Sequence, residues 1–68
     1  METYMKLKLY IDDKGVKQSA ISRKTGIHVK SLNAILNGHV ALKVDSLIAI
    51  CEKGLGTPVS DFFNYKVQ

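Results

Sequence analysis

Basic side chains between Lys14 and Lys43 are the residues of this chain with the clearest chemical use. That segment contains no Asp or Glu, so every acidic residue lies outside it. The whole chain carries a net charge of +4 and has a pI near 9.4. An acid-free basic block favours binding to a polyanion such as nucleic acid. The block contains Lys14, Lys17, Arg23, Lys24, Lys30 and Lys43, with His28 and His39 among them.

The other reactive residue types form no recognisable catalytic or metal-binding set. The spacing of His28, His39 and Cys51 does not match a metal-ligand motif. Cys51 falls at an apolar position and is interpreted as a small buried hydrophobe. The adjacent carboxylates Asp12 and Asp13 are interpreted as solubilising charge near a helix end. The sequence therefore predicts no enzyme, no metal site, no cofactor and no small-molecule ligand.

Length and composition predict one domain spanning residues 1–68. A chain of 68 residues, of which 46% are apolar, forms a compact domain but leaves no room for a deep catalytic cleft. With Cys51 as the single cysteine, a reducing cytoplasm is the expected compartment. No apolar run approaches the ~20 residues that span a bilayer, and no signal segment opens the chain. We expect no membrane association.

The segment from Gln18 to Asn37, QSAISRKTGIHVKSLNAILN, predicts two short helices joined by a tight turn. Ile21 and Thr25 stand four residues apart, and a similar apolar spacing recurs later in the segment, so each set shares one helix face. Gly26 supplies a residue that adopts positive φ after a helix, and Ile27 returns the chain to the interior. This arrangement suggests a helix presented to DNA.

The complete pattern predicts an all-α domain of five helices. Thr3 is a candidate N-cap of the first helix, and Gly54 is expected to break the fourth. Thr57 is expected to cap the last helix, with Pro58 at its first position. The predicted helices cover residues 3–12, 18–25, 29–36, 44–53 and 58–63, with a C-terminal tail over 64–68.

These residues resemble the Cro and phage-repressor class of helix-turn-helix domains, also called XRE-type. The resemblance covers roughly Leu7 to Phe63. The segment AILNGHVALK is most similar to the lambdoid repressors. Thr25 is a weak fit, because that position is usually apolar. The matching positions are Gln18, Ile21, Thr25, Gly26, Ile27, Leu32, Ile35, Asn37 and Gly38.

The resemblance implies that the third helix lies in the major groove of double-stranded DNA. Lys30 would then donate to guanine and Asn33 would pair with adenine. Val29 and Ala34 would meet thymine methyl groups. The residues implied to contact the DNA backbone are Lys17, Gln18, His28, Ser31, Asn37, Gly38, His39 and Lys43.

Two departures from the family pattern affect the expected packing and specificity. Many members have Gln where Val29 stands, and that residue pairs with the Gln at position 18. Gln18 therefore needs another partner, and specificity is expected to differ. Ile11 and Leu36 replace a buried Arg–Glu pair, and a joint apolar replacement of this kind is well tolerated.

A third departure concerns the helix N-caps. Lys17, His28 and Lys43 occupy positions where the family usually has Ser or Thr, and cations there oppose the helix dipole. We expect weak caps in the free protein. We also expect DNA phosphates to compensate these cations, which makes DNA binding strongly dependent on salt.

The C-terminal apolar residues predict either a dimer interface or a cover over the core of a monomer. One of Phe62 and Phe63 is expected to fill the core, and the remainder, with Tyr65 and Val67, to form a patch for a second copy. A two-fold dimer would place two recognition helices ~34 Å apart on an inverted-repeat operator. In the alternative, the aromatics seal the base of a monomer.

The sequence as a whole favours a Cro-like repressor of a phage or mobile element. Two alternatives remain open: an antitoxin-type protein that binds DNA and also a toxin, and a protein-interaction module that uses the same helices. The acid-free block argues against the interaction module, since a protein interface has no need to exclude Asp and Glu so completely.

Overall fold

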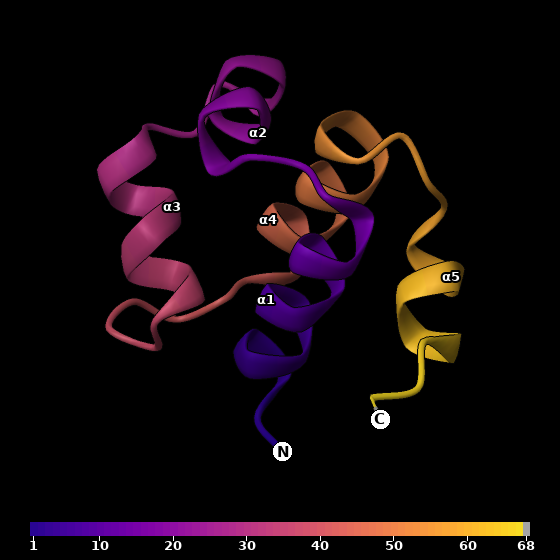
Figure 1. The fold of residues 1–68 in the computed structure, drawn as a ribbon. Helices are drawn as coiled ribbons and strands as arrows, with labels where there is room; N and C mark the ends of the chain where they lie inside the picture. The colour runs from indigo at the N-terminus through magenta and orange to yellow at the C-terminus, as the bar shows by residue number, and fades with distance from the viewer. Residues whose placement is uncertain (68) are drawn as a thin grey trace.

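Helices account for all the regular secondary structure of residues 1–67, which are the residues that the computed structural model describes. Gln68, the last residue of the predicted tail, lies outside the described residues. The predicted all-α fold is confirmed. α3 lies at one edge of the molecule beside α2, and α5 lies at the opposite edge (Figure 1). The elements are α1 (Thr3–Lys14), α2 (Gln18–Thr25), α3 (Val29–Leu36), α4 (Val44–Ala49), η1 (Ile50–Gly54) and α5 (Val59–Asn64).

α1 is longer than predicted and begins differently. It continues to Lys14, because Gly15 adopts a left-handed φ of 70° and its N–H bonds to the carbonyls of Asp12 and Ile11. Thr3 is the first helical residue and not the N-cap. Glu2 occupies the cap position, and its side chain makes no capping hydrogen bond.

The predicted fourth helix is divided into α4 and a π-helical turn, η1. The Leu55 N–H bonds to the carbonyl of Ile50 over 2.9 Å, which is the five-residue spacing of a π-helix. The helix ends at Gly54, one residue later than predicted, and Gly54 is its buried last residue. A Cβ at Gly54 would lie 2.9 Å from Cγ2 of Ile21 on α2 and 3.5 Å from Cγ2 of Thr25. The glycine therefore allows η1 and α2 to approach closely.

α5 begins one residue later than predicted. Pro58 is the N-cap of this helix, and the position that we assigned as the cap, Thr57, precedes it. The Thr57 hydroxyl lies 3.2 Å from the Tyr10 hydroxyl, within hydrogen-bonding distance. Thr57 therefore ties the loop before α5 to α1.

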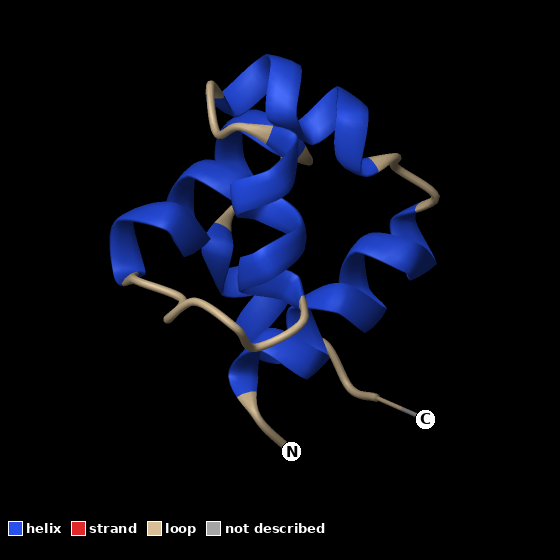
Figure 2. Cartoon of the chain, turned by 90° about the vertical axis from the view of Figure 1, so that its left-hand side faces the viewer, coloured by secondary structure: helices blue, strands red, loops and turns tan. Residues whose placement is uncertain are grey.

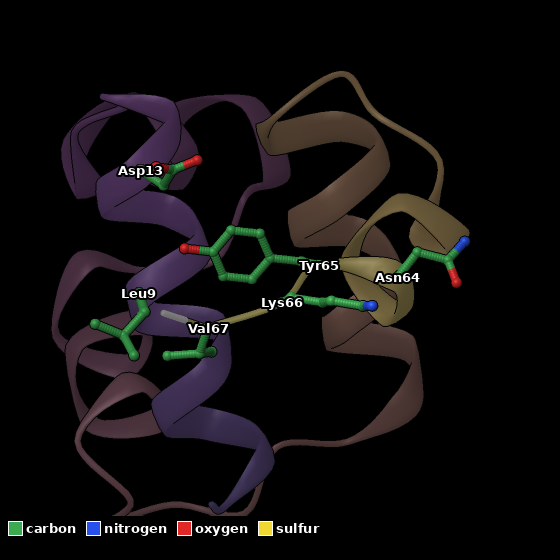
Figure 3. A pocket seen from close by; sticks show the side chains of 6 residues that line it. All are labelled: Leu9, Asp13, Asn64, Tyr65, Lys66 and Val67. Carbon is green, nitrogen blue, oxygen red and sulfur yellow. The ribbon is translucent and has the colours of Figure 1, made fainter.

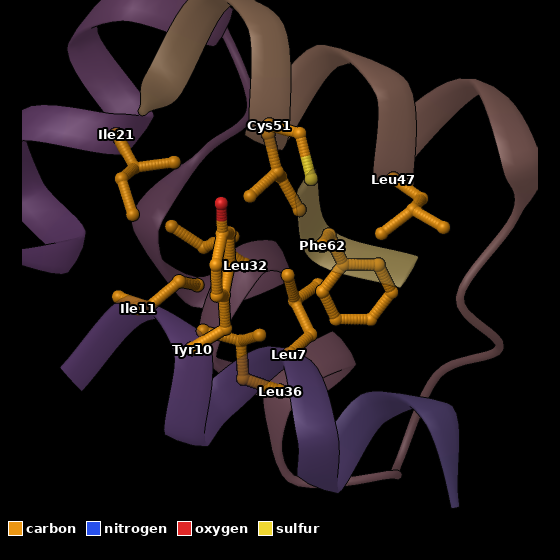
Figure 4. Packing of buried hydrophobic residues seen from close by; sticks show 10 residues of the cluster. Leu7, Tyr10, Ile11, Ile21, Leu32, Leu36, Leu47, Cys51 and Phe62 are labelled. Atoms are coloured by element: carbon orange, nitrogen blue, oxygen red, sulfur yellow. The ribbon is translucent and has the colours of Figure 1, made fainter. Parts of the chain in front are cut away.

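One apolar cluster joins all the helices (Figure 4). Ile11 and Leu36, which replace the family's charged pair, are 2% and 1% exposed and belong to this cluster. Phe62 is the aromatic residue of α5 that fills the core, with its ring 5.6 Å from that of Tyr10 in an edge-to-face arrangement. The buried members are Leu7, Tyr10, Ile11, Ile21, Leu32, Leu36, Leu47, Ile50, Cys51 and Phe62.

Candidate nucleic-acid interface

The turn between α2 and α3 is closed by polar side chains of α2. Gly26 has a φ of 79°, and its N–H bonds to the carbonyl of Ser22. The Ser22 hydroxyl donates to the carbonyl of Ile27. The Thr25 hydroxyl donates to the carbonyl of Ile21 over 2.7 Å and accepts from the Ile27 N–H over 3.2 Å. Thr25, where an apolar residue is usual, is therefore a structural part of the turn.

α3 has one buried face and one exposed face. Leu32, Ile35 and Leu36 are buried, which fixes the rotation of the helix about its axis. The predicted base-contacting residues share the other side: Val29, Lys30 and Asn33 are exposed, and Ala34 is half-buried. α3 lies at the edge of the molecule in Figure 1, on the side that faces the viewer in Figure 2. The structure brings the four predicted residues together on one helix.

The surface of α2, α3 and the loop that follows carries exposed basic side chains without any acidic residue. The acidic residues lie elsewhere: Glu2 at the start of α1, Asp12 and Asp13 near its end, Asp45 on α4, Glu52 on η1 and Asp61 on α5. A helix-turn-helix unit with Lys and Arg side chains and no carboxylates has a positive electrostatic potential, which attracts the phosphate backbone of DNA. The exposed basic residues are Lys17, Arg23, Lys24, His28, Lys30, His39 and Lys43.

The three predicted weak caps are not alike. Lys17 and Lys43 make no side-chain capping bond, as expected. His28 does cap α3, since its Nδ1 accepts the N–H of Lys30 over 3.2 Å. The prediction of a weak cap at His28 was therefore wrong: an imidazole with an unprotonated Nδ1 accepts a hydrogen bond as a Ser or Asn cap does.

Comparison with known proteins agrees with this geometry. The model of a family described as Cro/C1-type HTH DNA-binding domain matches residues 6–68, nearly the whole chain. The chain belongs to this Cro/C1-type helix-turn-helix family. No curated protein and no solved structure matches it.

The residues expected to contact the DNA backbone lie at the helix starts and in the turn after α3 of this Cro/C1-type domain. Lys17 and Gln18 are at the start of α2, His28 and Ser31 are at the start of α3, and Lys43 precedes α4. The turn supplies the others, Asn37, Gly38 and His39. Of the set only Gln18 is half-buried, and the rest are exposed.

Two residues of α1 join this surface and were not predicted from the sequence. A Cβ at Gly38, whose φ is 77°, would lie 2.6 Å from Cζ of Tyr4, so the Tyr4 ring packs directly on the turn. Lys8 Nζ donates to Asn37 Oδ1 over 3.0 Å. Tyr4 and Lys8 lie about thirty positions before their partners, so no local pattern identified the contacts.

The residues of the predicted C-terminal patch line two different grooves, apart from Phe62. Phe62 is 1% exposed and belongs to the core. Phe63 is 61% exposed and lines a groove of about 270 Å³ with Leu42 and Val44. Tyr65 and Val67 lie in a second groove, of about 620 Å³ (Figure 3). That groove is lined by Leu9, Asp13, Asn64, Tyr65, Lys66 and Val67.

The remaining reactive residues of the Cro/C1-type domain are dispersed. No cluster of three or more His, Cys, Asp or Glu side chains with metal-binding geometry occurs within residues 1–67. Burial, with a smaller contribution from the Glu52 carboxylate, raises the pKa of Cys51 to about 11. The thiol is therefore held protonated at neutral pH. None of the described helices is both long and apolar enough to cross a membrane.

Proposed function

We propose that this chain is a sequence-specific, double-stranded DNA-binding regulator that acts as a Cro-like repressor. The observation that carries the proposal is the exposed face of α3, which is fixed in rotation by three buried residues and belongs to a helix-turn-helix unit without any Asp or Glu. Such a helix enters the major groove with its exposed side chains against the base edges. On that face, Val29, Lys30, Asn33 and Ala34 read bases.

The flanking residues hold the DNA backbone and set the register of α3. Lys17 and Gln18 place a cation and free helix N–H groups at the start of α2, which is a favourable site for a phosphate. The other proposed backbone contacts are His28, Ser31, Asn37, Gly38, His39 and Lys43. A log–log plot of affinity against salt with a slope of only one or two ions per monomer would contradict this set.

The decisive experiment is selection of bound duplexes from a random library. We expect a defined motif for the unmodified protein. Lys30→Ala should relax the motif at one position, with a loss of roughly tenfold or more for the preferred base pair there. Lys53→Ala is the matched control, because Lys53 is an exposed lysine on η1, outside the helix-turn-helix unit. Uniform weakening by Lys30→Ala would reassign Lys30 to the backbone, and absence of any motif would refute the proposal.

We infer further that two copies bind an inverted-repeat operator through the exposed Phe63 and the adjacent Leu42 and Val44. Val44 is 70% exposed beside Phe63, and apolar exposure of this extent favours a contact between copies. Sedimentation with and without an inverted-repeat duplex tests it. Phe63→Ser should prevent two copies from binding cooperatively, and a single 7.5 kDa species unchanged by DNA would refute it.

A further inference from the structure

A chain of hydrogen bonds connects α1 to the reading face of α3. Lys8 Nζ donates to Asn37 Oδ1 over 3.0 Å. Asn37 Nδ2 in turn donates to the backbone carbonyl of Asn33 over 2.9 Å and to Asn33 Oδ1 over 3.0 Å. We propose that Lys8 is a positioning residue for base recognition: acting through Asn37, it fixes the Asn33 amide so that its NH₂ group is offered to the DNA groove. This inference rests on the proposed function.

The orientation of the Asn37 amide is determined from both ends. An asparagine amide has a donor end and an acceptor end, and its two orientations are distinguished by the groups around it. The Lys8 ammonium can only donate, so it selects the oxygen of Asn37. The backbone carbonyl of Asn33 can only accept, so it selects the nitrogen. Both neighbours require the same orientation, and a charged donor strengthens the bond that it makes.

The fixed Asn37 amide then orients Asn33. Asn37 offers its Nδ2 to the side chain of Asn33, so the oxygen end of the Asn33 amide is turned toward Asn37. The end that faces away is Nδ2, a donor. Asn33 is exposed one turn beyond Val29 and Lys30 on the same side of α3. Its donor end is therefore available to a base edge.

A donor on this face changes the base that Asn33 prefers. Pairing with adenine needs the asparagine oxygen to accept from N6 while the nitrogen donates to N7. In this chain one lone pair of the Asn33 oxygen already accepts from Asn37. Guanine presents only acceptors, N7 and O6, in the major groove. The hydrogen bonds from Lys8 through Asn37 to Asn33 therefore shift the base preference of Asn33. It moves from adenine, which the family resemblance implies, toward guanine.

The test is Lys8→Met, which keeps an unbranched side chain and removes the donor. Four duplexes that differ only at the pair read by Asn33, located as the position at which Asn33→Ala loses its preference, are compared by competition binding. Unmodified protein should prefer guanine over adenine at that position. Lys8→Met should reduce this preference by about threefold to tenfold, the effect of losing one solvent-exposed hydrogen bond, and leave the preference at other positions unchanged.

Three comparisons make the result decisive. Lys53→Met, with the same change of charge on η1, should leave the guanine preference intact. In an Asn33→Ala background, Lys8→Met should have no further effect on the preference. The Tm of Lys8→Met should stay close to that of the unmodified protein, because Lys8 and Asn37 are exposed.

The opposing outcomes are equally distinct. If Lys8→Met lowers the affinity for all four duplexes equally and reduces the salt slope by about one ion, Lys8 contacts a phosphate. That result would overturn the proposed positioning role of Lys8. An adenine preference in the unmodified protein, or a guanine preference unaffected by Lys8→Met, would also overturn it while the proposed function stands. Absence of sequence preference on every duplex would overturn the proposed function itself, and this inference with it.

Discussion

Gly54 and Gly38 mark two places where the helix-turn-helix unit meets the rest of the chain, and the two contacts differ in kind. At Gly54 the closest neighbour of an added Cβ is Cγ2 of Ile21, inside the core. At Gly38 it is the half-buried ring of Tyr4, at the surface. An enclosed, β-branched side chain has no room to move, whereas a ring at the surface can turn toward solvent. The first contact therefore holds the unit in place, and the second positions the end of α3.

The largest effect is expected from Gly54→Val. The added side chain would overlap Ile21 and force η1 away from α2, so we expect a loss of roughly 3 kcal/mol in the free energy of unfolding. For a domain of this size that lowers Tm on the order of 15 °C. Thermal unfolding followed by circular dichroism measures it. Lys53→Val is the control, an exposed position of the same turn, with an expected change within about 0.5 kcal/mol. An unchanged Tm for Gly54→Val would show that the buried contact yields as easily as the surface one.

A smaller effect is expected at high pH from Cys51, a buried residue of the same element, η1. Burial raises the pKa of Cys51 from 9.0 to about 11. Above pH 9 the unfolded chain releases the thiol proton while the folded chain retains it. The contribution to stability is therefore complete below pH 9 and is lost as the pH rises toward 11. We expect a loss of about 2 kcal/mol over that range.

Urea unfolding at several pH values, with Cys51→Ala for comparison, isolates this contribution. The alanine variant retains every other titrating group, so the difference between the two slopes belongs to the thiol. Equal slopes for the two proteins between pH 9 and 11 would show that Cys51 is hydrated in the folded state.

The parts of the fold that the sequence predicted correctly are those with local signals. The bounds of α2 and α3 match the prediction, because Gly26 ends one helix by its left-handed backbone and Asn37-Gly38 follows the other. The buried position of Phe62, in contrast, could not be chosen over Phe63 beforehand. The two residues have the same type, and only the rotation of α5 against Tyr10 decides between them.

The parts that the sequence did not predict depend on contacts between distant segments. The sequence identified Gly54 only as a helix end, and its close approach to Ile21 on α2 became visible only in the structure. The bond from Lys8 to Asn37 joins residues on different helices, and α1 alone shows Lys8 only as an exposed lysine. For the candidate site, the residue types and their common helix face followed from the pattern, but the orientation of the Asn33 amide did not.

The smallest effect, and the sharpest test of the comparison, is expected from Gly38→Ala. The left-handed φ of 77° costs an alanine about 1 kcal/mol, and the Tyr4 ring must also move aside. Because that ring can turn toward solvent, the total should stay near 1 to 2 kcal/mol, below the cost of Gly54→Val. Affinity for the preferred duplex should fall several-fold more than stability explains, since Asn37 precedes the displaced residue.

Tyr4→Ala separates the two parts of that cost in a double-mutant cycle measured by urea unfolding. In the Tyr4→Ala background, Gly38→Ala should retain the backbone strain and lose the clash, so the glycine substitution should cost about 0.5 kcal/mol less than in the unmodified protein. A coupling near zero would mean that the Tyr4 ring moves aside freely. A cost equal to that of Gly54→Val would mean that the surface contact is as rigid as the buried one, and the distinction between the two contacts would fail.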